Sequence, residues 1–572
     1  MSGDYGAVAL LIVVAIGLSI PVGRYIALVF MGRPTWFDRV VGPLEGFILR
    51  LSGVDATRGQ DWRQYATSLL VSNAVMWLAA LAIFTAQGHL PFNPDAIAGM
   101  EPTLAFNTAS SFTTNTNLQH YSGETGLSLL SQMVVVTFLQ FMTAATGMAA
   151  AMAVMRGLAG DRLTTLGNFH VDLVRAAVRV LLPMSLVIAL VLLGQGTPMT
   201  FDGAVSASTL EGGEQRIARG VVASMVAIKQ LGTNGGGYFG ANSAHPFENP
   251  TALSNAVESI SILLLPMATI WALGHVVRRR RVAVMVFAVM LALYLPLLAV
   301  AVTQEAGGHP AMPQLGVDQS AGAMEGKEVR MGSVLTAFWA VSTTATSNGS
   351  VNGMLDSLTP LGGLAAMAGL WLNCIFGGVG VGFVNMFVFI VIAVFVAGMM
   401  IGRTPEFLGK RVEAKEMKLA SLALLWHPLA ILVGTAIASW TWSATAQPGD
   451  TLAWLRNPGP HGFSEMLYEF SSAAANNGSG FEGLGDNTPF WNITTGVVMV
   501  LSRYVPIVAP LALAGSLAAK PTVPDSAGTL QAGSLTFGVM LWAVVVVLGL
   551  LMFLPVAVLG PIAEFLALPT GS

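Results

Sequence analysis

Ten stretches of the chain are long, apolar and nearly free of charge. Nine contain no charged residue, namely 5–23, 64–94, 125–155, 180–201, 259–277, 282–304, 357–402, 419–449 and 526–563, and the tenth, 487–519, is interrupted only by Arg503. A helix needs about 20 apolar residues to cross a bilayer. The sequence therefore predicts an all-α integral membrane protein with about ten transmembrane helices.

The composition and the N-terminus support this prediction. Only 10% of the residues are charged, whereas about 25% is usual for soluble domains. Cys374 is the single cysteine, which excludes an intramolecular disulfide. Residues 1–4 contain no Lys or Arg, and no cleavage site follows the first apolar run. We therefore expect that run to be a retained helix rather than a signal peptide.

Four short, uncharged segments rich in Thr, Ser, Asn and Gly lie between the apolar stretches. They cover 113–117, 232–236, 345–350 and 475–479. Aligned on the second polar residue, they share one column of Asn115, Asn234, Asn348 and Asn477, followed by Thr116, Gly235, Gly349 and Gly478. By subtraction, the copies are 119, 114 and 129 residues apart. This spacing predicts four pseudo-symmetric units whose polar segments meet at one axis.

Each unit is predicted to be a helix, a pore loop and a second helix. The spanning pairs are expected near 66–86 and 128–152, 173–196 and 254–276, 282–303 and 364–397, and 419–440 and 491–516. Short helices near 102–112, 217–230, 333–345 and 464–474 precede the polar segments. The predicted parts are a first helix with a basic cytoplasmic loop (1–63), pore repeats 64–160, 161–281, 282–418 and 419–520, and a last helix near 534–560 (521–572). The four repeats would therefore surround one pore, with one extra helix at each end of the chain.

The short helices cannot span the membrane, so each is expected to enter it and turn back. Irregular backbone at membrane depth is tolerated where it is buried or lines water, and helix C-termini favour cations. Converging main-chain carbonyls can replace the water shell of a monovalent cation, and no carboxylate is present to favour divalent ions. A single such segment is by default a turn. Four copies in the same context favour a K⁺-selective filter.

Basic residues fall unevenly on the two sides of the predicted membrane. Alternate loops carry 20 Lys and Arg residues on one side and six on the other. The first group is Arg24, Arg33, Arg39, Arg50, Arg58, Arg63, Arg156, Arg162, Arg175, Arg179, Arg278–Arg281, Arg403, Lys410, Arg411, Lys415, Lys418 and Lys520; the second is Arg216, Arg219, Lys229, Lys327, Arg330 and Arg456. Cytoplasmic loops are rich in Lys and Arg. The first side is therefore predicted to be cytoplasmic, with both termini and all four segments extracytoplasmic.

Longer strings around the segments resemble a known family. TNTN, KQLGTNGGG, NSAHPFENPT, STTATSNGSVNG and SSAAANNGSGFEGL are similar to the potassium-binding subunit of the bacterial Kdp potassium-transporting ATPase. The resemblance covers essentially the whole chain and lies within a superfamily of potassium transporters with four pore repeats. It implies that the filter consists of Thr113, Thr114, Asn115, Thr116, Asn117, Gly232, Thr233, Asn234, Gly235, Gly236, Thr346, Ser347, Asn348, Gly349, Asn476, Asn477 and Gly478. The first copy then departs from the others, with Thr116 in place of Gly.

The resemblance also implies a complex in the bacterial cytoplasmic (inner) membrane. The potassium-binding chain would select K⁺ outside and pass it sideways through an intramembrane tunnel to a P-type ATPase subunit, which hydrolyses ATP. The resemblance implies a small single-span subunit of the Kdp complex as a second partner. It leaves open whether a further small membrane subunit also belongs to the complex. The expected contacts are membrane lipid and transported K⁺, with no other cofactor and no nucleic acid. The chain has no phosphate-binding loop and no Asp-Lys-Thr-Gly motif, so it is predicted not to be an enzyme by itself.

Three features outside the filter have more than one interpretation. Gly377, Gly378, Gly380 and Gly382 either allow close helix packing or, as superfamily resemblance suggests, form a broken helix that acts as a gate. Lys229 precedes a filter segment and is expected to bond carbonyls or a carboxylate behind it rather than to conduct. Arg503 lies inside a spanning helix, where charge is costly and usually functional. It would line the pathway, repel ions from a blind exit, or pair with an acid at a subunit contact.

Other functions are less well supported by the sequence. His245 and Glu248 lack the spacing of a zinc site, and Arg278–Arg281 is most simply an orienting loop. A hydrolase using Ser479 would need a histidine base, and we expect none at membrane depth. The main alternative is an autonomous K⁺ channel or ion-coupled transporter on the same scaffold.

Overall fold

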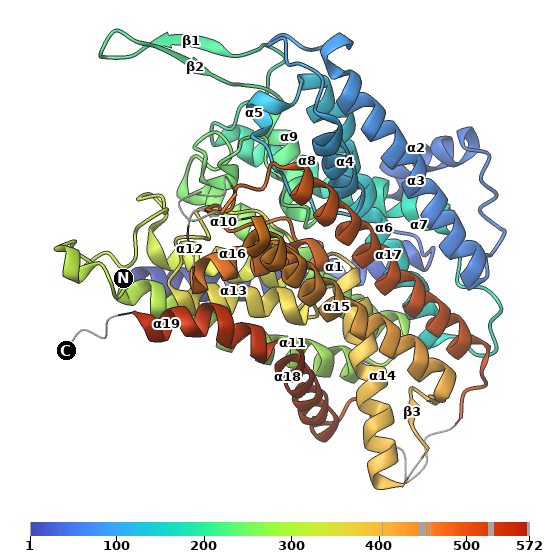
Figure 1. Ribbon diagram of the computed structural model, residues 1–572. Helices are drawn as coiled ribbons and strands as arrows, with labels where there is room; N and C mark the ends of the chain where they lie inside the picture. The colour runs from blue at the N-terminus through green and yellow to red at the C-terminus, as the bar shows by residue number, and fades with distance from the viewer. Residues whose placement is uncertain are drawn as a thin grey trace.

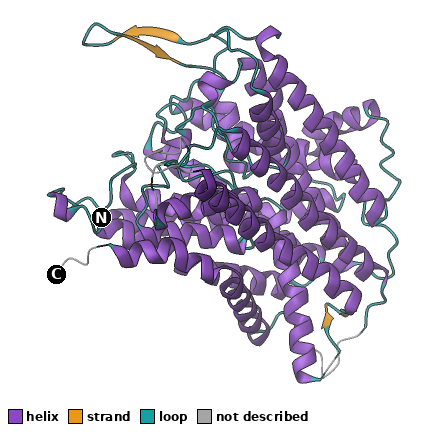
Figure 2. Ribbon diagram, viewed as in Figure 1, coloured by secondary structure: helices purple, strands orange, loops and turns teal. Residues whose placement is uncertain are grey.

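A computed structural model describes residues 2–402, 404–445, 454–455, 457, 459–523 and 531–568. The regular secondary structure within them is helical apart from two short β-hairpins, and loops connect the elements (Figure 2). Ten helical segments of the described chain are long and apolar enough to cross a membrane, as predicted. Residues 446–449 and 526–530 of the predicted runs, the counted charges Arg403 and Arg456, and the chain ends 1 and 569–572 lie outside the described residues.

The spanning segments follow the predicted order, and three of them contain a π-helical turn. They are α1 (Ser2–Phe30), α3 (Trp62–Ala86), Ser131–Thr137 with α6 (Phe138–Ala159), α7 (Phe169–Arg175) through to α8 (Leu182–Gly194), α10 (Ala252–Val276), α11 (Arg280–Gly307), α14 (Val381–Ile401), α15 (Ala414–Thr445), α17 (Pro489–Ala519), and α18 (Leu535–Ala557) through to α19 (Ala563–Ala567).

Four shorter helices end just before the polar segments. These helices are α4 (Pro102–Thr113), α9 (Val222–Leu231), α12 (Gly332–Ala345) and α16 (Pro460–Ala475). Local sequence explains where α4 begins, because Pro102 needs no hydrogen bond at the first helical position and the Glu101 carboxylate accepts one from the Leu104 N–H. All four helices are almost entirely buried.

The second short helix begins later than predicted. Its expected start near residue 217 is wrong, because Glu214–Ile217 forms strand β2, which pairs antiparallel with β1 (Val205–Ser208). Cross-strand pairing satisfies this backbone, and the hairpin extends away from the helical body at the upper left of Figure 1. Arg216 on this hairpin pairs with Asp95 in an earlier loop.

The predicted continuous helix 364–397 is also wrong. The structure contains α13 (Pro360–Leu372) and α14, separated by residues 373–380. Asn373, Phe376, Gly377 and Gly380 in this connection have positive φ, which an α-helix cannot accommodate. A side chain on Gly380 would lie less than 3.0 Å from the Gly147 carbonyl. The glycine-rich stretch is thus a break in the helix, as the broken-helix interpretation required, and its glycines also allow close packing.

The predicted basic loop before α3 contains a helix of its own, α2 (Asp38–Leu51). Glu45 on α2 is buried and pairs with Arg175 and Arg179, and Asp38 accepts a second hydrogen bond from Arg179 at 2.8 Å. In Figure 1, α2 lies at the right and β3 (Glu406–Phe407) at the lower right. The start of α1 and the end of α19 lie together at the left, so the chain begins and ends on the opposite side from these elements.

Candidate ion-binding site

The four polar segments share one backbone conformation. In each, two residues separated by one position have positive φ: Asn115 and Asn117, Thr233 and Gly235, Ser347 and Gly349, Asn476 and Gly478. The N–H of the residue between them bonds to a carbonyl five residues back: Thr116 to Ser111, Asn234 to Lys229, Asn348 to Thr343, and Asn477 to Ser472, at 2.9–3.0 Å. The same turn therefore follows each of the four short helices.

This shared geometry corrects the alignment of the first segment. Thr116 occupies the column of Asn234, Asn348 and Asn477, and Asn117 occupies the column of the glycines. The predicted equivalence of Thr116 with Gly235 is wrong by one residue. The sequence alignment matched Asn with Asn, whereas the backbone matches the residues that have positive φ. Asn is the non-glycine residue that tolerates positive φ best, which explains how Asn117 replaces glycine.

The segments contact one another in order around a ring. Asn115 of the first donates to the Thr233 carbonyl of the second at 2.8 Å. A side chain at Gly235 would lie less than 3.0 Å from the Asn348 carbonyl oxygen of the third segment. A side chain at Gly349 would lie less than 3.0 Å from the Asn477 carbonyl oxygen of the fourth segment. A side chain at Gly478 would lie less than 3.0 Å from the Thr116 carbonyl oxygen of the first. Glycine is therefore required here because the neighbouring backbone occupies the space of a side chain.

In one column of this ring, the main-chain carbonyl of every segment is left without a donor. Within the described residues, no hydrogen-bond donor reaches the carbonyl oxygens of Thr116, Asn234, Asn348 or Asn477. These four residues are fully buried and occupy the same column. Buried carbonyls are nearly always paired, so four equivalent exceptions in one ring are suited to hold a cation.

Asparagine amides join neighbouring units around the ring. Asn348 donates to the carbonyls of Lys229 and Gln230 at the end of α9, and Asn477 donates to Thr343 near the end of α12 at 2.8 Å. Each amide thus fixes its segment to the end of the preceding unit's short helix. All four short helices end at the ring, where their C-terminal dipoles favour a cation.

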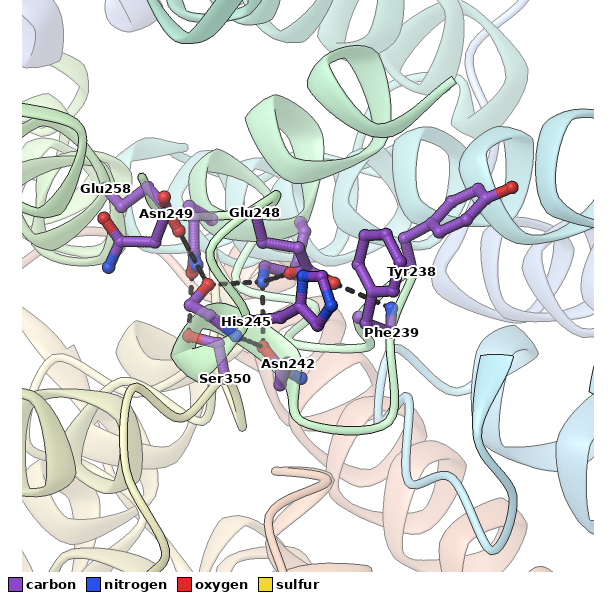
Figure 3. A network of polar contacts seen from close by, with 12 residues as sticks. Tyr238, Phe239, Asn242, His245, Glu248, Asn249, Glu258 and Ser350 are labelled. Atoms are coloured by element: carbon purple, nitrogen blue, oxygen red, sulfur yellow. Dashed lines mark hydrogen bonds and ion pairs between the residues drawn. The ribbon is translucent and has the colours of Figure 1, made fainter. Parts of the chain in front are cut away.

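Lys229 is held by a polar network behind the second segment. Figure 3 shows the part of this network around Asn242, Glu248 and Glu258. Its ammonium donates to Asn242 Oδ1 at 2.8 Å and to Ser243 Oγ at 2.6 Å, and it pairs with Glu248. Both charged side chains are completely buried. Asn242 in turn donates to the Gly235 carbonyl at 2.7 Å. Of the two partners that the sequence left open, carbonyls or a carboxylate, the structure contains the carboxylate, and Lys229 contacts the ring through Asn242.

The network continues to the third segment. Gln230 donates to Glu258 at 2.8 Å, and Ser243 donates to the same carboxylate at 2.7 Å. Ser350, the last residue of the third segment, donates to Gln230 Oε1 at 2.8 Å. Glu258 and Gln230 were not singled out in the sequence, because nothing in their spacing shows that α9 and α10 lie side by side.

The break between α13 and α14 is bonded to the ring itself. The Val379 N–H donates to Thr233 Oγ1 at 2.9 Å, and Ser347 Oγ donates to Asn373 Oδ1 at 2.8 Å. The Gly377 N–H bonds to the Ala345 carbonyl at the end of α12 at 2.9 Å. The candidate gate glycines therefore lie directly against the second and third segments.

Arg503 lies beside this break. Its guanidinium donates to the Thr143 carbonyl at 3.3 Å, and no carboxylate among the described residues pairs with it. It lines a cavity together with Ser347 and Asn476 of the ring, Gly378 of the break, and Asn385 of α14. Arg503 thus contributes an uncompensated positive charge, within the described chain, to a cavity that touches the third and fourth segments.

A buried histidine was missed in the sequence. His120 follows the first segment and joins it to the fourth unit, with Nδ1 2.7 Å from Asn492 Oδ1 and Nε2 3.1 Å from Glu469 Oε1. Asp486 lies 3.9 Å from Nε2. Burial alone would lower the pKa of His120, but the charge of Asp486 and the hydrogen bond to Glu469 raise it to about 9.

Stability is expected to fall at alkaline pH because of this group. A histidine whose folded pKa is raised stabilises the fold fully below its unfolded pKa of about 6.5 and stops doing so as pH rises through the folded value. Thermal unfolding of the wild type should therefore shift to lower temperature between neutral pH and about pH 10. His120→Gln should lose most of that pH dependence. An identical pH profile for the variant would exclude this role.

Two other predicted residues take structural positions. His245 stacks on Phe239 with ring centroids 3.8 Å apart, and Glu248 is engaged by Lys229, so they do not form a metal site. The expectation of no histidine at membrane depth is wrong, because His427 lies within α15. Its Nε2 faces the Leu370 carbonyl at 3.0 Å, and Ser479 Oγ bonds Tyr468 and Asn477 rather than a histidine.

Comparison with known proteins gives a consistent result. The family model described as potassium-transporting ATPase A subunit matches residues 9–566. A "Potassium-transporting ATPase potassium-binding subunit" from Phocaeicola vulgatus is 52% identical over 558 residues, which are 97% of this chain and 98% of the relative. One from Geobacillus kaustophilus, with the same description, is 49% identical over 565 residues, 99% of each chain.

A solved structure shares the fold. The crystal structure of the potassium transporter TrkH from Vibrio parahaemolyticus matches with a TM-score of 0.50 at 13% identity, covering 88% of this chain and 97% of that one. At this identity the likeness concerns the fold alone. The family match over nearly the whole length is more specific, and the chain belongs to the family of potassium-transporting ATPase A subunits, multi-pass bacterial membrane proteins that form one part of a multi-subunit ATPase.

Proposed function

We propose that this chain binds extracytoplasmic K⁺ in the ring of four polar segments and passes it through the membrane in a high-affinity, ATP-driven uptake system. The observation that carries the proposal is the set of four donor-free carbonyls at Thr116, Asn234, Asn348 and Asn477. Uncharged carbonyl oxygens replace the weakly held hydration shell of K⁺. The description of the curated relatives as potassium-binding subunits supports the same ion.

The four segments would then form the filter of one pore, with pore repeats at 64–160, 161–281, 282–418 and 419–520. The unequal distribution of Lys and Arg supports an extracytoplasmic filter and extracytoplasmic termini. The positions of α1 and α19 at the same side of the molecule agree with this orientation (Figure 1).

Energy would come from partner chains, namely the P-type ATPase subunit together with the single-span subunit. Below the ring, an ion would reach the cavity lined by Ser347, Asn476 and Arg503. Because the Arg503 guanidinium has no carboxylate partner among the described residues, it would repel a cation and oppose direct descent into the cytoplasm. The glycine-rich break at 373–380 is the proposed gate, and a sideways path to the P-type ATPase subunit would bypass the arginine.

Gly235→Asp tests the filter. An aspartate would collide with the Asn348 carbonyl and add a charge to an uncharged ring, so K⁺ affinity or K⁺/Rb⁺ discrimination should fall sharply. Binding and uptake of K⁺ and Rb⁺ are compared for wild type and variant, with and without the ATPase subunits. Wild-type uptake should require the partners and ATP.

Two outcomes would contradict the proposal separately. Unchanged K⁺ binding and selectivity in Gly235→Asp would exclude the four-segment filter. K⁺ conduction by the purified wild-type chain alone would instead favour an autonomous channel or ion-coupled transporter on this scaffold.

A further inference from the structure

A second cluster of ionisable side chains lies outside the ion ring. It forms where the loop after the third segment meets the beginning of α16 and the terminal helix α19. His461 and Glu465 are one turn apart on α16, Asp356 comes from the loop, and Glu564 from α19. Three distant parts of the chain therefore converge on one imidazole.

The distances are close to those of a metal site. His461 Nε2 lies 3.0 Å from Asp356 Oδ1 and 3.8 Å from Glu465 Oε1. The three groups offer ligand atoms that all lie within 4.8 Å of one another. Metal–ligand bonds of about 2.0–2.2 Å in a tetrahedral site place the ligand atoms about 3.3–3.6 Å apart. Small side-chain movements would therefore bring all three atoms onto one cation.

One carboxylate oxygen of this cluster is left without a hydrogen-bond partner, and the backbone approaches the carboxylates closely. Glu465 is completely buried, and its Oε2 has no hydrogen-bond partner. A side chain on Gly483 would lie less than 3.0 Å from both Glu465 Oε1 and Asp356 Oδ2. A buried carboxylate oxygen without a partner is costly, and no described Lys or Arg forms an ion pair with Glu465 or Asp356. The cation facing these carboxylates within the described residues is therefore His461 when protonated, and a metal ion would take the place of its Nε2 proton.

The imidazole is also oriented as in metal sites. His461 Nδ1 lies 2.8 Å from Glu564 Oε1, which leaves Nε2 facing the other two carboxylates. Histidines that bind metals commonly donate their second ring N–H to a carboxylate in this way. The His461 side chain is 23% exposed, so the cluster can be reached from solvent.

We propose that Asp356, His461 and Glu465 form a binding site for a first-row divalent cation such as Zn²⁺, with Glu564 orienting the imidazole. Imidazole nitrogen and carboxylate oxygen are both ligands of Zn²⁺, and in sites with three protein ligands water completes the coordination. The two carboxylates would neutralise the dication. Bound metal would fix the loop after the third segment, α16 and α19 to one another, and so hold in place the helix that precedes the fourth segment.

The test uses the assembled ATPase complex without a polyhistidine tag, treated with EDTA and dialysed. Co²⁺ is the spectroscopic probe, because its visible absorption reports a low-symmetry site with nitrogen and oxygen ligands. Wild type is compared with His461→Gln and Glu465→Gln. His309→Gln is the matched control, since His309 lies in a loop outside the cluster. Zn²⁺ competition then gives the relative affinity.

Wild type and His309→Gln should bind one more Co²⁺ per complex than His461→Gln, with a visible spectrum that Zn²⁺ removes. Glu465→Gln should weaken binding at least tenfold. Equal Co²⁺ binding and equal spectra in wild type and His461→Gln would overturn the proposal, since metal would then bind elsewhere in the complex. If neither ligand variant assembles, the wild-type complex still decides, because the absence of Zn²⁺-displaceable Co²⁺ absorption would also overturn it.

Discussion

Gly349→Ala is expected to lower K⁺ affinity by up to about 100-fold, because the added methyl group displaces a ring carbonyl and each 1.4 kcal/mol lost corresponds to a factor of ten. Gly349 has φ of +91°, a conformation that costs a residue with a Cβ about 1–2 kcal/mol. The added methyl group would also overlap the Asn477 carbonyl oxygen, and overpacking of this kind costs about 1–3 kcal/mol. The carbonyl that must move is one of the four without a donor.

The matched control is Gly212→Ala on the hairpin. Gly212 also has positive φ, +82°, but nothing lies within 4 Å of the position of its missing Cβ. It therefore carries the backbone penalty without the collision, and K⁺ binding should stay unchanged. Equilibrium binding of K⁺ to the complex measures both variants. Equal affinity for Gly349→Ala and wild type would mean that Asn477 contributes nothing to the ion site.

Lys229→Met is expected to cost about 3–5 kcal/mol of stability, the usual effect of removing one partner from a buried ion pair. Glu248 would remain completely buried without its ammonium partner. Asn242 would lose the contact that positions it under the Gly235 carbonyl, so K⁺ affinity should fall as well. Thermal or denaturant unfolding in detergent measures the stability, and K⁺ binding is followed in parallel.

Two further variants separate charge from packing. Arg216→Ala removes an ion pair with Asp95 in which the arginine is 63% exposed, and it should cost about 0–1 kcal/mol. The double variant Lys229→Met, Glu248→Gln should recover part of the stability, because no unpaired charge remains buried. A Lys229→Met protein as stable as Arg216→Ala would show that the buried pair is unimportant to the fold.

The sequence predicted the spans well and the local backbone less well. Runs without charge located ten spanning helices because lipid excludes charge regardless of tertiary context. The resemblance suggested the break at 373–380, but hydrophobicity did not, since apolar residues and glycines continue through it and its glycines pack against Gly147 and the ring. Phe376 has positive φ there, which no propensity rule would assign to it, whereas Asn373 is of a type that tolerates this conformation.

The sequence predicted which segments form the candidate site, but it did not predict which residue of the first segment corresponds to the glycines of the others. The alignment of Thr116 with glycine failed because polar identity does not indicate which residue is left-handed, whereas φ and the hydrogen bonds of each turn do. His120, Glu258 and Gln230 were missed for another reason. Their partners come from distant segments, and a single sequence carries no signal for contacts of that kind.

The hydrogen bonds between the helix break and the ring have a thermodynamic consequence. Thr233 and Ser347 belong to the ring and also bond to the segment between α13 and α14. Any rearrangement of that segment that breaks these bonds must alter the ring, and ion occupancy must alter the equilibrium of that rearrangement to the same degree. In the proposed function, ion binding at the four carbonyls and opening of the break would therefore be reciprocally coupled, so the affinity for the ion should differ between the two states of the break.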